Sequence, residues 1–63
     1  MKCSQLIRIL TRDGWYSESQ KGSHLKMKHP TKKGILIVPD HGSQEIGKGL
    51  ESKILKAAGI ILK

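Results

Sequence analysis

Residues 21–28 read KGSHLKMK, and this stretch decides the fold. Gly22-Ser23 is a two-residue turn signal in which the glycine supplies a positive φ, so it predicts a β-hairpin. The residues that follow, HLKMKH, alternate between apolar and polar side chains, as a strand with one buried face does. The apolar face of this strand holds Leu25 and Met27, and the other face holds His24, Lys26 and Lys28. We therefore expect a strand whose exposed face is cationic.

Two further strands are expected on either side of this one. WYSESQK, residues 15–21, alternates more weakly and forms the first arm of the hairpin, where Trp15 is more typical of a core residue than of a base-stacking platform. PTKKG is a second turn, and ILIVP, residues 35–39, is a third strand that Pro39 ends. Because ILIVP is apolar on both sides, we expect its outer face to be partly covered.

A helix is expected at each end of the chain. CSQLIRILTRDG, residues 3–14, has Ser4 as a candidate N-cap and Gly14 as its left-handed end. Its apolar residues recur at helical spacing; they are Cys3, Leu6, Ile7 and Leu10. KGLESKILKAAG, residues 48–59, follows a glycine-containing loop and ends at Gly59. Its expected apolar stripe is Leu50, Ile54, Ala57 and Ala58, and the tail IILK is expected to pack back on the core.

The element order is therefore α-β-β-β-α, in a single domain over residues 1–63. Three sequential antiparallel strands can form a meander with one buried face, and two amphipathic helices can cover that face. The predicted fold class is α+β, a two-layer sandwich with both helices on one side of a three-stranded sheet. His24, Lys26 and Lys28 then line the open side.

The charge distribution indicates a polyanionic partner. The 63 residues carry a net charge of +7, and residues 21–33 hold five lysines and two histidines without an acidic residue. One cysteine excludes an internal disulfide and favours a reducing compartment. The N-terminus lacks the pattern of a signal peptide, and no apolar run is long enough to cross a bilayer. We expect a cytoplasmic protein that has no contact with a membrane.

Several short motifs together resemble the HicA family of toxins from toxin–antitoxin pairs. They are Gly14-Trp15 after the first helix, KGSH before the alternating strand, Val38-Pro39, His41-Gly42, and the helix end ILKAAG. The resemblance implies a fold like that of double-stranded-RNA-binding domains and an mRNA interferase activity, with His24 as the catalytic residue. It also implies a HicB-type antitoxin that covers the active face. Glu18 and Asp40 depart from the family pattern, which often has basic residues or histidine near these positions.

The residues around His24 suit metal-independent cleavage of RNA. The ribose 2′-OH is an internal nucleophile, and histidine can serve as the general base or acid. Ammonium groups stabilise the charge that develops on the phosphate. The predicted RNA-binding residues are Lys21, Gly22, Ser23, Lys26, Lys28, His41 and Lys48. His41 lies in a loop, where a structural hydrogen bond is an equal alternative, and Lys48 begins the second helix, where backbone N–H groups can bind phosphate. No cofactor is expected.

Other readings of the same residues remain open at this point. The chain could be a non-catalytic double-stranded-RNA-binding module, or a basic adaptor for an acidic protein. A zinc site built from Cys3 and the three histidines matches no common ligand spacing. Strand parity turns His29 away from His24, so His29 is expected to be a strand-end or turn residue. Lys32 and Lys33 are expected in a turn, where a solvated hairpin tip is slightly favoured over contact with RNA.

Overall fold

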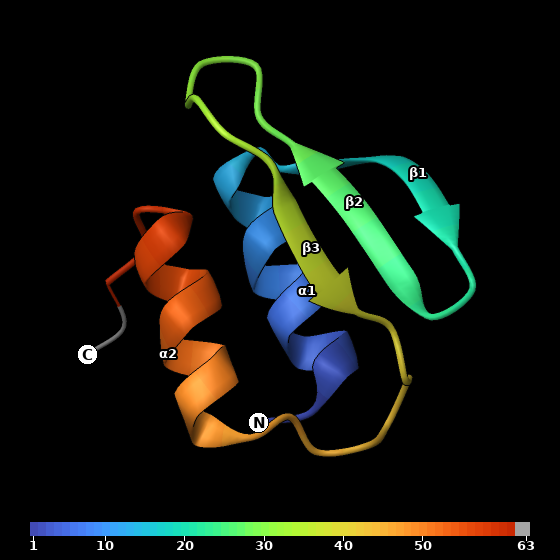
Figure 1. The fold of residues 1–63 in the computed structure, drawn as a ribbon. Coiled ribbons are helices and arrows are strands. Elements are labelled where there is room, and N and C mark those ends of the chain that lie inside the picture. Colours follow the sequence, from blue (N-terminus) through green and yellow to red (C-terminus); the bar gives the residue numbers. More distant parts are fainter. Residues whose placement is uncertain (62–63) are drawn as a thin grey trace.

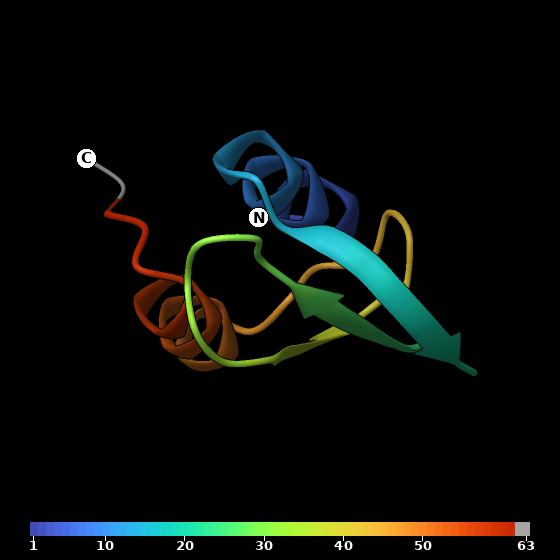
Figure 2. The same cartoon turned by 90° about the horizontal axis from the view of Figure 1, so that it is seen from above.

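The computed structural model describes residues 1–61 and has the predicted order of elements (Figure 1). Its helices and strands are α1 (Cys3–Asp13), β1 (Tyr16–Lys21), β2 (His24–Lys28), β3 (Leu36–Pro39) and α2 (Lys48–Ala57). The strands form one antiparallel sheet in the order β1-β2-β3. Seen from above, α1 lies on one side of the strands and α2 runs beside β3 (Figure 2). The α+β fold expected from the sequence is confirmed.

The side chains of β2 alternate between buried and more exposed positions, as predicted. Leu25 and Met27 of β2 are buried, and their neighbours on β3 in the same register, Val38 and Leu36, are buried too. Because paired residues in antiparallel strands point to the same face, these four side chains form the floor of the core. Both helices add core residues, which are Cys3, Leu6 and Leu10 from α1 and Ile54 and Leu55 from α2, and Ile46 and Ala58 on either side of α2 are buried as well. Trp15 is also buried in the core, as expected.

The start of α1 differs from the prediction. Lys2, not Ser4, is the N-cap, and Ser4 lies inside the helix with its side chain exposed. The first helical N–H groups are satisfied by backbone carbonyls of the loop after β3, since Cys3 N donates to Gln44 O at 2.9 Å and Ser4 N donates to Gly42 O at 3.0 Å. A side-chain cap is therefore not needed. The predicted end is confirmed, because Gly14 closes the helix with φ 109°.

The apolar stripe of α2 is rotated from the one expected. Ile54 and Ala58 are buried as predicted, but Leu55 takes the third buried position, while Ala57 is exposed and Leu50 remains 45% exposed. Glu51 takes the inward position of the first turn, where its Oε1 accepts a hydrogen bond from the N-terminal amino group at 3.2 Å. This ion pair links α2 to the start of the chain and leaves Leu50 at the side of the helix.

Two further expectations about apolar segments were wrong in part. Ile60 packs against the core, but Ile61 is 85% exposed, and Leu62 and Lys63 lie outside the described residues. The outer face of β3 was expected to be partly covered, yet Ile37 on that face is 53% exposed. Within residues 1–61, neither helix combines the length and the apolar character of a membrane-spanning segment.

Candidate active site

One hairpin brings together six of the eight predicted site residues. The turn Gly22-Ser23 joins β1 to β2, and Gly22 has the predicted positive φ of 60°. Lys21 and His24 are paired across this turn, so their side chains share the open face of the sheet. His24 is the first residue of β2 and is exposed. Lys26 and Lys28 follow it on the same face at the strand period of two.

The turn before His24 is fastened to the end of β3 by a clamp that the sequence did not reveal. Gln20 Nε2 donates to Gly22 O and to Asp40 Oδ2, both at 3.1 Å. The backbone N–H of Asp40 donates to Ser23 O at 2.7 Å. These bonds fix the backbone that carries His24 against the segment that continues to His41. A glutamine and an aspartate twenty positions apart give no local signal, because only the register of the sheet brings them together.

The cationic face also holds an acid. Glu18 Oε2 lies 2.7 Å from Lys28 Nζ, and Glu18 Oε1 lies 3.6 Å from Lys26 Nζ. The hydrogen bond from Lys28 is the main cause that lowers the pKa of Glu18 from its usual 4.5, and the same contact raises the pKa of Lys28 above 10.5. Glu18 and Lys28 are therefore both charged at neutral pH. Lys21 has no ion pair with any residue in the described range 1–61.

His41 and Lys48 lie on other elements. His41 is exposed in the loop that follows β3, directly after the clamped Asp40. That loop continues to the start of α1, where its backbone caps the helix. Lys48 is the first residue of α2, which runs on the other side of β3 from the hairpin (Figure 1). His41 thus follows a segment that touches the turn, whereas β3 separates Lys48 from the hairpin.

His29 belongs to a separate cluster at the far end of β2, as strand parity predicted. Its Nε2 bonds the carbonyl of Asp13 at 2.7 Å, and its Nδ1 accepts from the backbone N–H groups of Thr31 and Lys32, both at 3.1 Å. This pattern requires the neutral ring with its proton on Nε2. The ring packs edge-on against Trp15, with centroids 5.2 Å apart. His29 is therefore a structural residue that joins α1 to the turn after β2.

Lys32 completes the same cluster, which corrects its assignment to a solvated hairpin tip. Its ammonium group bonds the carboxylate of Asp13 and donates to Ala58 O at 2.9 Å. Lys33 remains exposed, as expected. In residues 1–61, no three potential metal ligands lie close enough together to hold an ion.

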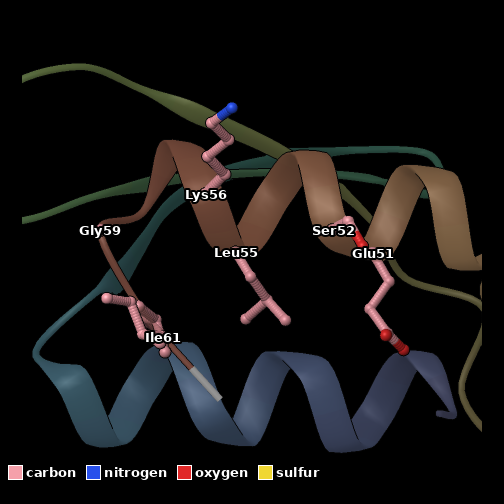
Figure 3. Close-up of a pocket in the computed structure, with 7 residues that line it drawn as sticks. Glu51, Ser52, Leu55, Lys56, Gly59 and Ile61 are labelled. Atoms are coloured by element: carbon pink, nitrogen blue, oxygen red, sulfur yellow. The ribbon is translucent and has the colours of Figure 1, made fainter. Parts of the chain in front are cut away.

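A cavity of about 590 Å³ lies on the helical side of the molecule, away from the hairpin (Figure 3). Leu55 and Glu51 point from α2 toward α1, and Lys56 points the other way. The lining residues are Glu51, Ser52, Leu55, Lys56, Gly59, Ile60 and Ile61. This set contains none of the predicted site residues, so the hairpin face remains the candidate active site.

Two comparisons with known proteins cover almost the whole chain. Residues 3–60 match the family model described as HicA toxin of bacterial toxin-antitoxin. A protein of Pseudomonas fluorescens (strain Pf0-1), named probable mRNA interferase HicA, is 38% identical over 60 residues. The match covers 95% of this chain and 97% of that relative. Both matches span the hairpin, the clamp and both helices.

Proposed function

Because this chain belongs to the HicA family of bacterial toxin–antitoxin toxins, we propose that it is an endoribonuclease that cleaves mRNA. The relative from Pseudomonas fluorescens carries that activity in its name. The observation that carries the proposal is the exposed imidazole of His24, held by a clamped turn on the same face as Lys21, Lys26 and Lys28. This arrangement puts an imidazole, which can act as a general acid or base, beside cations that can bind a phosphodiester.

The proposed reaction uses the RNA as its own nucleophile. Neutral His24 takes the proton of a ribose 2′-OH, and the 2′ oxygen forms a bond to the adjacent phosphorus while the bond to the 5′ oxygen breaks. The products are a 2′,3′-cyclic phosphate and a free 5′-hydroxyl, so the leaving oxygen must receive one proton. His41 and Lys21 are the two candidates for this donor. Lys26 and Lys28 stabilise the charge on the nonbridging oxygens. These steps need no metal and no cofactor.

The other proposed contacts belong to RNA binding rather than to proton transfer. The tight Gly22-Ser23 turn lets a phosphate approach the backbone next to His24, and Lys48 at the start of α2 would hold a more distant phosphate. We expect a single strand to run from the hairpin toward α2. Its phosphates would be held mainly by charge, so binding should weaken steeply as salt rises.

The decisive experiment removes the His24 imidazole. His24→Ala should lose cleavage of RNA while keeping the circular dichroism spectrum and the cooperative unfolding of the parent, since His24 is exposed and outside the core. Cleavage is measured in the presence of a chelator, on RNA and on the same oligonucleotide with a 2′-deoxy residue at the cut. A His24→Ala variant that cuts at the parent rate would refute the catalytic role. If the wild type binds duplex RNA but cuts nothing, the non-catalytic RNA-binding module is the correct reading.

The partner that silences this activity is proposed to be a HicB-type antitoxin. A cationic face with the exposed Ile37 beside Lys26 suits an acidic protein surface with an apolar centre. We expect the complex to bury His24, Lys26 and Lys28. Amine labelling tests this, because Lys26 and Lys28 should become protected when the antitoxin binds, while Lys33 on the far turn should not. Equal labelling of all three lysines in the complex contradicts the proposed interface.

A further inference from the structure

Glu18 lies on the cationic face at a local irregularity in β1. The register pairs Ser17 with Met27 and then Ser19 with Lys26, so Glu18 is the extra residue of a β-bulge. A bulge changes the direction of a side chain and is common beside active sites. Here the two oxygens of the Glu18 carboxylate contact Lys26 and Lys28 of β2 separately. A single anion thus bridges both lysines of the proposed active face.

We propose that Glu18 is a built-in competitor for RNA, whose carboxylate occupies the position of a phosphate between Lys26 and Lys28 and must be displaced when RNA binds. The inference rests on the proposed function and adds a control on substrate affinity to it. A carboxylate and a phosphodiester are both oxyanions that accept hydrogen bonds from ammonium groups. The two lysines therefore form a subsite that a phosphate can occupy in the same bridging manner.

The exposure of the three groups supports an exchangeable contact rather than a structural one. The side chains of Glu18, Lys26 and Lys28 are 35%, 39% and 40% exposed. Ion pairs that water reaches contribute little to folding stability, so opening this one does not require the sheet to open. The lowered pKa of Glu18 means that the competitor is ionised at neutral pH. RNA must therefore displace an ionised group, and the displaced carboxylate takes up a counterion.

The test compares two variants that remove the same charge from different places. Glu18→Gln keeps the size of the side chain and frees the lysines. Glu45→Gln is the matched control, since Glu45 pairs with the N-terminal amino group at 3.2 Å and is 71% exposed. Binding is measured on a single-stranded RNA with 2′-O-methyl sugars, which the proposed reaction cannot cut. Thermal unfolding of both variants checks that each one folds.

Glu18→Gln should bind this RNA roughly two- to tenfold more tightly than Glu45→Gln, the size expected for one or two exposed ion pairs. The plot of log K against log salt should steepen by about 0.7, because one more counterion is released per RNA bound. In a Lys28→Gln background the gain from Glu18→Gln should shrink, since the closer partner is gone. Equal affinities of the two single variants, or weaker binding by Glu18→Gln, would overturn the inference.

The same measurements separate this inference from the proposed function. A wild type that cleaves RNA, with Glu18→Gln and Glu45→Gln indistinguishable in binding, refutes the competitor and leaves the nuclease standing. A wild type that does not cleave RNA refutes the nuclease whatever the two variants do. If Glu18→Gln increases RNA affinity by the same factor in the Lys28→Gln background, the effect is one of long-range charge. That result overturns the proposal that RNA displaces Glu18 from the lysines.

Discussion

Replacing Gly14 with alanine should destabilise the fold far more than the same replacement at Gly34. Both glycines have a positive φ, 109° at Gly14 and 99° at Gly34. A Cβ at Gly34 would have no heavy atom within 4 Å, whereas a Cβ at Gly14 would lie 2.7 Å from His29 Nε2. The two substitutions therefore share a backbone cost and differ in one contact. Their difference isolates what it costs to move the His29 ring.

The magnitudes follow from the geometry. A left-handed backbone costs an L-residue about 1–2 kcal/mol, which both variants incur. To relieve the contact at Gly14, the His29 ring must leave the Asp13 carbonyl at 2.7 Å and the two backbone N–H groups at 3.1 Å. Each lost hydrogen bond costs about 0.5–1.5 kcal/mol, so this adds about 2–4 kcal/mol at Gly14 alone. We expect a loss of about 3–6 kcal/mol for Gly14→Ala and about 1–2 kcal/mol for Gly34→Ala.

The assay is urea unfolding followed by the fluorescence of Trp15, the only tryptophan, which is buried in the fold and packs against His29. A domain of this length has a total stability of about 3–9 kcal/mol, so Gly14→Ala should lie near the folding limit. A double-mutant cycle adds the decisive comparison. In a His29→Ala background, Gly14→Ala should cost no more than Gly34→Ala does in the parent. Equal costs at Gly14 and Gly34, or an undiminished cost without His29, would refute the reasoning.

Two further predictions concern Asp40 in the clamp and Asp13 in the cluster around His29. Asp40→Ala should lower kcat about three- to tenfold, because it releases Gln20 and loosens the turn before His24, at a cost of about 1 kcal/mol. Asp40→Asn can still accept the hydrogen bond from Gln20, so its kcat should stay within twofold of the parent value. Equal losses of kcat in both variants would mean that the charge of Asp40 matters and the clamp does not. For Asp13, the hydrogen bond from Lys32 holds the pKa below its usual 3.8 in the folded state, so its stabilising contribution is present above that value and is lost as the pH falls through the folded pKa. The free energy of unfolding should therefore fall more steeply with acid in the parent than in Asp13→Asn, and parallel curves would contradict the assignment.

The features that could be predicted from the sequence are those with a local cause. The alternation in residues 24–28 sets which side chains face the core, and Gly22 sets the turn, so the shared face of Lys21 and His24 follows from a few neighbouring residues. Gly14 ends α1 for the same kind of reason. The main members of the candidate site lie on one hairpin, which is why a local pattern was enough to group them.

The features that could not be predicted depend on contacts between distant segments. Ser4 was expected to cap α1, but the loop around Gly42 supplies the carbonyls instead. The buried stripe of α2 is rotated because Glu51 reaches the N-terminal amino group at the opposite end of the chain. Neither partner can be recognised from the residues next to Ser4 or Glu51. The predictions of the α1 cap and of the buried side of α2 were therefore wrong, because contacts from distant parts of the chain outweighed the local preference.

The same distinction separates the proposed catalytic group from the residues that hold it. The turn and the strand alone place His24 on the open face, but the clamp from Gln20 to Asp40 exists only in the register of the folded sheet. Glu18 lies beside a bulge in β1, where both oxygens of its carboxylate contact the lysines of β2. Glu18 therefore reduces the positive charge that RNA first meets at this face. If Glu18 is displaced as proposed, the full positive charge of the hairpin becomes available only to a ligand that binds both lysines.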